Sequence, residues 1–170
     1  MTRKQRLRRV GILCCHCLRN LAFYKAGWRN GKLIFHDQFW VNANGNFLDI
    51  CVMEWCKLFG EVRGAHYWKK VISTPDEFFG SLLNEAKVTE AELDDYIKEM
   101  RTYRDKFVAH LDSEETMHIP KLDVAHKTAS YLYDYLLANE DEGGYFADAP
   151  RKASTFYQKY LKEAKSVYDQ

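Results

Sequence analysis

Apolar residues recur at steps of three and four along most of the chain, which is the period of a helix that buries one face. The pattern predicts a first helix over about residues 4–25, ended by Gly27 and the stretch Arg29-Asn30-Gly31. A second, strongly apolar helix is expected over about residues 39–59, with Gly60 as its end. Within it, Asn44-Gly45 is a weak point at which we expect a late start or a bend.

The later helices have clearer start signals. Thr74-Pro75-Asp76-Glu77 and Thr89-Glu90-Ala91-Glu92 both have the pattern of a capping box, and the first has proline at the opening helical position. A fifth helix before Gly143-Gly144 has apolar residues at heptad spacing: Leu122, Ala125, Ala129, Leu132 and Leu136. A last helix is expected from Asp148-Ala149-Pro150, with an inward face formed by Phe156, Tyr160 and Ala164 or Val167. These elements predict an all-α, single domain over residues 1–170, folded as an antiparallel bundle of five to six helices.

Composition agrees with a folded helical domain and narrows its function. Of the 170 residues, 46% are hydrophobic and only three are proline, which argues against disorder and against an all-β fold. The formal net charge of +1 argues against a protein that binds nucleic acid through its bulk charge. Contacts to nucleic acid would need local patches, and one basic run contains Arg3, Lys4, Arg6, Arg8 and Arg9. That run is either such a patch or simply a solvated helix start.

The five cysteines indicate a reducing compartment, and we expect a cytoplasmic protein. Their number is odd, and Cys14, Cys15 and Cys17 lie too close together for a disulfide framework. Only Cys14 and Cys17 would share a helix face, so buried thiols are favoured over zinc ligands, and we predict no metal and no other cofactor. No apolar run approaches the roughly 20 residues of a membrane span, and residues 11–18 are interpreted as helix rather than as a signal peptide.

The helix that follows Thr89 has an arginine in its apolar stripe. On a wheel of about 100° per residue, Tyr96 and Tyr103 flank a stripe formed by Leu93, Ile97, Met100, Phe107 and Leu111. Arg104 falls inside this stripe, and His110 lies at its other margin if the helix stays regular. An unpaired buried charge is costly, so Arg104 needs a function or a partner. The structural alternatives are a salt bridge to a carboxylate on a neighbouring helix and a side chain whose head reaches water.

The segment Arg104-Asp105-Lys106-Phe107-Val108-Ala109-His110 resembles the arginine-x(4–6)-histidine motif of HEPN domains, in which a polar residue usually follows the arginine. The longer string through Asp112 is similar to the abortive-infection AbiU branch of that superfamily, and Phe39-Trp40 and the helix after it fit the same branch. The resemblance covers about residues 35–140. It implies a helical bundle that pairs as a homodimer. It also implies either a metal-independent endoribonuclease of prokaryotic toxin–antitoxin or antiviral defence systems, or an inactive binding module.

The two motif residues suit metal-free RNA cleavage. His110 can take the proton of the 2′-hydroxyl and protonate the leaving 5′-oxygen, because the pKa of imidazole lies near neutrality. Arg104 can hold two phosphate oxygens while remaining charged, and two copies of the motif at a two-fold axis would supply base, acid and two cations. We expect Asp105 to orient or restrain this pair, and Arg101 and Lys106 to contact backbone phosphates of the RNA.

The leading hypothesis is therefore a homodimeric endoribonuclease acting on RNA, held in check by an antitoxin or another regulatory protein. One alternative is a catalytically inactive HEPN-like module that binds RNA or a partner protein in the same groove. Another is a structural helical adaptor in which Arg104 forms a buried ion pair. Tyr103, at the edge of the stripe, either stacks on an RNA base or belongs to the core.

Overall fold

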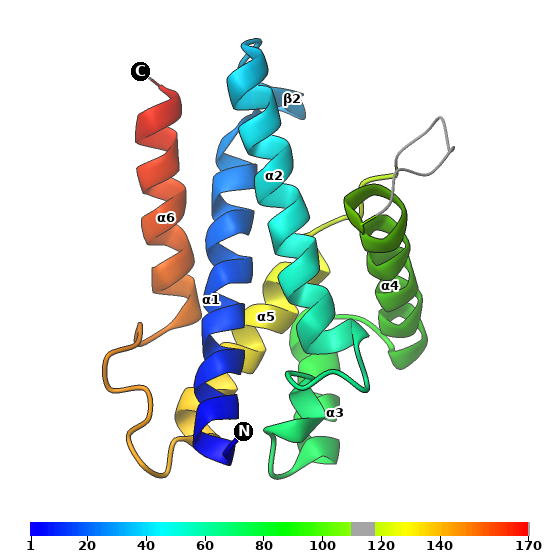
Figure 1. Ribbon diagram of the computed structural model, residues 1–170, viewed down its shortest axis with the longest axis vertical. Helices are drawn as coiled ribbons and strands as arrows, with labels where there is room; N and C mark the ends of the chain where they lie inside the picture. Colours follow the sequence, from blue (N-terminus) through cyan, green and yellow to red (C-terminus); the bar gives the residue numbers. More distant parts are fainter. Residues whose placement is uncertain (110–117, 170) are drawn as a thin grey trace.

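Three long helices lie side by side and form one layer of the molecule (Figure 1). They are α1 (Arg3–Ala26), α2 (Gln38–Trp55) and α6 (Ala153–Tyr168), and α1 lies between the other two and contacts both. The prediction of an antiparallel bundle holds for α2, which runs against α1. It does not hold for α6, which runs parallel to α1 because the preceding helix, α5 (Asp123–Tyr135), already runs in the opposite direction.

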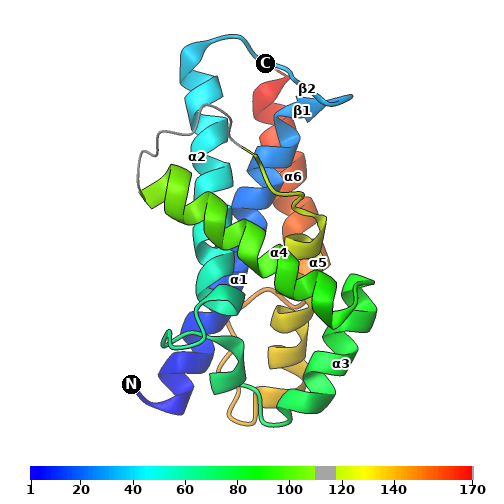
Figure 2. The same ribbon diagram turned by 90° about the vertical axis from the view of Figure 1, so that its right-hand side faces the viewer.

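Two shorter helices and α5 complete the bundle. α5 lies against α1 and α6, and α3 (Pro75–Ala86) packs on α5. Figure 2 shows α4 (Glu90–Tyr103) crossing α2 at a steep angle. The computed structural model describes residues 1–109 and 118–169. None of the helices within these residues combines the length and the apolar composition that a bilayer crossing requires.

Three helices continue into wider, π-helical turns. η1 (Cys56–Gly60) follows α2, η3 (Arg104–Ala109) follows α4, and η4 (Leu136–Glu140) follows α5. Such turns are rare and frequently occur at functional sites. The turn after α4 begins at Arg104, the residue that the sequence pattern already sets apart.

A small hairpin connects α1 to α2, which the sequence did not predict. It consists of β1 (Trp28–Arg29) and β2 (Lys32–Leu33), paired antiparallel. Asn30 and Gly31 form its turn with φ angles of 52° and 75°. This left-handed region is accessible to glycine and tolerated by asparagine, so the residues that end the first helix also reverse the chain.

The core is centred on Trp55, whose side chain is completely buried. Its indole Nε1 donates to Thr128 Oγ1 at 2.9 Å, and the Thr128 hydroxyl donates in turn to the Val124 carbonyl at 2.8 Å. The ring stacks on Phe59 and meets Tyr96 edge-on, with centroids 5.1 and 5.2 Å away. One side chain thus joins α2, η1, α4 and α5.

Several sequence predictions are confirmed. Thr89 Oγ1 accepts from the Glu92 backbone N–H at 3.2 Å, and Glu92 Oε2 accepts from the Thr89 backbone N–H at 2.7 Å, as a capping box requires. α3 starts at Pro75 as expected, but the Thr74 hydroxyl bonds to the Tyr135 hydroxyl at 2.9 Å and does not cap the helix. The heptad face of α5 is buried throughout: Leu122, Ala125, Ala129, Leu132 and Leu136.

Two other predictions were wrong. α2 passes through Asn44-Gly45 without interruption, because the Asn44 side chain is buried and donates to the Tyr24 carbonyl at 2.9 Å. The last helix begins at Ala153 instead of Asp148, because the Asp148 carboxylate pairs with Arg8 of α1 at 2.9 Å. The residues of α6 that are buried are Ala153, Tyr157 and Ala164, whereas Phe156 and Tyr160 are half-buried and Val167 is exposed.

Replacing Thr128 by alanine should lower the free energy of unfolding by about 1–3 kcal/mol, because the Trp55 N–H would remain buried without its acceptor. Urea unfolding followed by tryptophan fluorescence measures the change. Ser130→Ala, in the same helix, is the matched control, because the buried Ser130 Oγ has no hydrogen-bond partner among the described residues. We expect this control to change stability by less than about 0.5 kcal/mol. Equal losses in the two variants would contradict a specific role for the bond to Trp55.

Candidate functional site

Arg104 stands where α4 passes into η3. The residues that α4 buries are Leu93, Tyr96, Met100 and Tyr103, so the two tyrosines belong to the core stripe and not to its flanks. The Arg104 side chain is 19% exposed. Arg104 therefore lies at the margin of the stripe, and the wheel that placed it inside fails after Tyr103, where the helix widens.

Two carboxylates hold the Arg104 guanidinium. Nη1 donates to Glu61 Oε1 at 2.9 Å, and Nε donates to Asp105 Oδ1 at 2.8 Å. Nη2 lies 2.8 Å from the same Asp105 oxygen. The hydrogen bond to Asp105 raises the pKa of Arg104 above its ordinary value, more than burial lowers it. The ion pair that the sequence left open as an alternative is present. Its partner distant in sequence, Glu61, lies in the loop after η1 and not on a neighbouring helix.

A pocket of about 430 Å³ adjoins this ion-pair cluster. It is lined by residues 60–64 at the end of η1 and in the loop that follows, and by Arg101 and Arg104. Arg101 reaches the pocket across Gly60, where an added Cβ would lie 3.2 Å from Arg101 Cγ. The lining contains three guanidinium groups, those of Arg63, Arg101 and Arg104, and one carboxylate, that of Glu61. Because positive charge is in excess, the pocket suits an anion such as a phosphate.

Only some of the residues expected to form the site contact Arg104 or line its pocket. Asp105 contacts Arg104 directly, and Arg101 lines the same pocket. Lys106 is half-buried in η3 and is not among the residues that line this pocket. His110, the expected acid and base, lies outside the described residues.

Tyr103 belongs to the core. Its side chain is 3% exposed, which leaves no ring face on which an RNA base could stack. The hydroxyl donates to Asp49 Oδ1 of α2 at 2.8 Å. Burial raises the pKa of Asp49, and the bond from Tyr103 lowers it again. Of the two interpretations of Tyr103 left open by the sequence, the structure favours the core residue.

Two lining residues, Glu61 and Arg63, were not singled out from the sequence. Both lie in the segment Gly60-Glu61-Val62-Arg63-Gly64, in which charged residues stand between two glycines directly after an apolar helix. Such a segment predicts an exposed loop. Its contact with Arg104, more than forty positions later in the chain, depends on the crossing of α2 and α4, which no local pattern predicts.

The Cys56 thiol, whose charge interacts with that of Arg104, is buried. Burial raises the pKa of Cys56 to about 12, although Arg104 acts in the opposite direction. All five cysteines are free thiols, and Cys17 Sγ lies 3.7 Å from Cys51 Sγ. Within residues 1–109 and 118–169, no group of three or more His, Cys, Asp or Glu side chains is placed to hold a metal ion.

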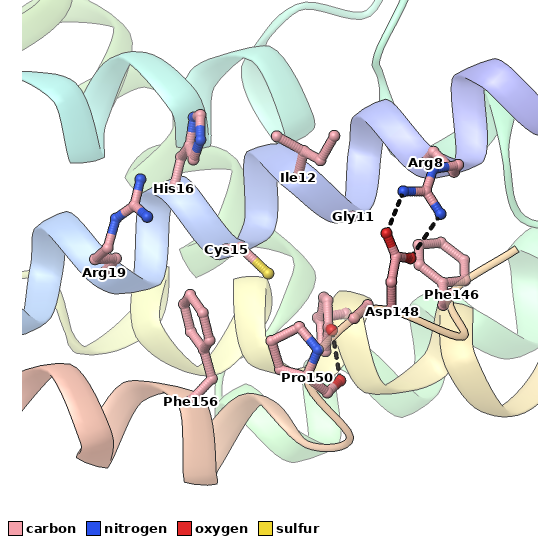
Figure 3. Close-up of a pocket in the computed structure, with 12 residues that line it drawn as sticks. Arg8, Gly11, Ile12, Cys15, His16, Arg19, Phe146, Asp148, Pro150 and Phe156 are labelled. Atoms are coloured by element: carbon pink, nitrogen blue, oxygen red, sulfur yellow. Dashed lines mark hydrogen bonds and ion pairs between the residues drawn. The ribbon is translucent and has the colours of Figure 1, made fainter.

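A second cavity, of about 230 Å³, lies between α1 and the segment that precedes α6 (Figure 3). Arg8 and Asp148 stand at one end of it, joined by two contacts of 2.9 and 3.0 Å, and His16 and Arg19 stand at the other. Burial raises the pKa of Cys15, whose sulfur points inward, to about 11. Because the Arg104 pocket is lined by three guanidinium groups and one carboxylate, and contains the first residue of the arginine–histidine motif, we favour it as the candidate site.

Comparisons with known proteins give no significant match. No protein-family model, no curated protein and no solved structure is similar enough to this chain to assign it to a family. A function can therefore be inferred only from the chemistry of the Arg104 pocket and from the sequence motif that contains Arg104.

Replacing Tyr103 by phenylalanine should reduce stability by about 1–2 kcal/mol at pH 7. The reduction should be smaller at pH 4. Burial raises the pKa of Asp49 in the folded protein above its value in the unfolded chain. Ionisation of Asp49 therefore lowers the free energy of unfolding as the pH rises from the unfolded pKa through the folded pKa. The Tyr103 hydroxyl lessens this cost by stabilising the carboxylate, and its loss matters only where Asp49 is ionised.

Urea unfolding at the two pH values measures this difference. Tyr131→Phe is the control, because Tyr131 is half-buried and packs against Phe78 instead of a carboxylate. A loss that is independent of pH, or equally pH-dependent in the control, would contradict the role of the hydroxyl in holding Asp49 ionised.

Proposed function

We propose that this chain is a HEPN-like, metal-independent endoribonuclease that cleaves RNA through Arg104 and His110 at a homodimer interface in the cytoplasm. The observation that carries the proposal is the pocket in which Arg104, Arg101 and Arg63 surround a space large enough for a phosphodiester. Arg104 is at the same time the first residue of the arginine–histidine motif. A prokaryotic defence or toxin–antitoxin system is the setting that the resemblance implies.

The Arg104 guanidinium is oriented by its carboxylates without being saturated. Arginine has five N–H donors, and the contacts to Glu61 and Asp105 engage three of its nitrogens. Each Nη therefore keeps an N–H that these contacts do not need. A fixed guanidinium with remaining donors can stabilise charge that develops on a phosphate without reorganising first.

His110 is assigned the proton transfers. An imidazole with an ordinary pKa can both accept the 2′-hydroxyl proton and protonate the leaving oxygen. One chain offers one such motif, so a second copy related by a two-fold axis would complete the set of base, acid and two cations. Such an enzyme also needs restraint in the cell, which fits an antitoxin or another regulatory partner.

One observation favours a second candidate, a catalytically inactive module that binds RNA or a protein. Two carboxylates, Glu61 and Asp105, lie within 2.9 Å of Arg104 and largely neutralise its charge. A phosphate must compete with them. In an inactive module this ion-pair cluster would serve only to hold the loop against α4.

Purified protein should cleave a labelled structured RNA in excess EDTA and leave 2′,3′-cyclic phosphate ends. We expect His110→Ala to abolish the cleavage. Arg104→Ala should reduce its rate by about 10²–10³-fold or more, because the donor to the transition-state phosphate is lost. Arg151→Ala, which removes an exposed arginine outside the Arg104 pocket, is the matched control and should cleave normally.

Circular dichroism should show equal helix content in all three variants. Normal cleavage by Arg104→Ala would exclude the proposed mechanism. RNA binding without cleavage by the unmodified protein would favour the inactive module instead.

A further inference from the structure

The loop over residues 61–67 has basic groups on both of its sides. On one side, Arg63 lines the pocket of Arg104. On the other, the loop lies beside the first turns of α1, as Figures 1 and 2 both show. The loop therefore connects the Arg104 pocket to the basic run at the start of the chain.

His66 of this loop lies within a group of cations. Burial lowers its pKa, and Arg9, Lys57 and Arg6 lower it further, in that order, while Glu54 opposes them. Lys57 is paired with Glu54 at 3.0 Å. The charges that act on His66 thus come from α1, α2 and η1 and are predominantly positive.

The arginines of the basic run of α1 differ in whether they are paired. Arg3 and Arg8 pair with carboxylates of η4 and of the segment before α6, so they fasten the start of α1 to the bundle. Arg6 and Arg9 are three residues apart and are neighbours on the helix surface. Neither forms an ion pair with any residue in the described part of the chain.

Two polar atoms in this group lack partners. Arg6 Nε and His66 Nε2 are both buried, and neither has a hydrogen-bond partner among the described residues. Unsatisfied buried groups and neighbouring like charges both cost stability. An anion bound at this surface would offset the second cost, because its charge opposes those of Arg6, Arg9 and Lys57.

We propose that Arg6, Arg9, Lys57 and His66 form an extended binding surface for the phosphate backbone of an RNA strand. Arg63 joins this surface to the Arg104 pocket, so one strand contacts both. The assignment rests on the proposed function for its choice of RNA as the ligand. It names the substrate as a strand that extends several nucleotides beyond the cleaved bond.

The test measures binding of a short, single-stranded 2′-O-methyl oligonucleotide, which cannot be cleaved because its 2′-oxygens are blocked. Fluorescence anisotropy of the labelled oligonucleotide is recorded at several salt concentrations for the full chain. The double variant Arg6→Gln with Arg9→Gln should bind about tenfold more weakly, with a slope of log affinity against log salt reduced by about 1.4. The matched control, Lys162→Gln with Lys165→Gln, removes two exposed charges from α6 and should leave both quantities unchanged.

A further variant, Arg6→Lys with Arg9→Lys, keeps the charges and should retain most of the affinity. Loss of affinity in the lysine variant with unchanged thermal unfolding would overturn the electrostatic part of the proposal. Equal losses in the glutamine variants of α1 and α6 would overturn the surface itself. The surface would also be overturned if the glutamine variant of Arg6 and Arg9 bound phosphatidylserine vesicles more weakly but bound the oligonucleotide as tightly as the unmodified protein does.

Failure of this proposal can be told apart from failure of the proposed function. Binding that depends on Arg6 and Arg9, without any RNA cleavage, supports the surface and contradicts the nuclease. Cleavage that depends on Arg104, with oligonucleotide binding indifferent to Arg6 and Arg9, supports the nuclease and overturns the surface.

Discussion

The position of Trp55 is the constraint on which the candidate site depends. An indole N–H buried in an apolar core must find an acceptor, and here it finds the Thr128 hydroxyl of α5. The ring also packs on Phe59 and Tyr96, so the end of α2 is fixed against both α5 and α4. The loop that carries Glu61 leaves the bundle directly after this point. A shift of Trp55 would therefore move Glu61 relative to Arg104 and alter the pocket between them.

The site combines two solutions to the problem of a charged group near a core. Asp49 is partly desolvated and is kept ionisable by one hydrogen bond from Tyr103. Arg104 is charged at any working pH, and its charge is balanced by Asp105 and Glu61 within hydrogen-bond distance. The second arrangement leaves donors unused, and it can be exchanged for a phosphate, which matches the guanidinium as well as a carboxylate does. In the proposed function, a ligand must be a strong anion to compete with these two carboxylates for the guanidinium.

Much of the helical framework could be predicted from the sequence, because caps and apolar periodicity act over a few residues. The Thr89 capping box fixed the start of α4 correctly. The same pattern identified Arg104 as unusual but could not supply Glu61, since that contact spans 43 positions and arises only when α2 and α4 cross. The wheel also misplaced Tyr103 and Arg104 relative to the core. For Arg104 the reason is that the wheel assumed one helical period, whereas the turn widens at this residue.

Net charge was a poor predictor of the basic surface proposed above, because it does not describe where the charges lie. Charges farther apart than about 10 Å are largely screened in salt solution, so a ligand responds to the local distribution of charge and not to the sum. A total of +1 conceals a run of arginines in which some side chains are paired and others are not. Sequence alone could not separate Arg8, which is neutralised by Asp148, from Arg9, which acts on His66. That separation follows from how the helix is turned against its neighbours, and the proposed phosphate-binding surface depends on it.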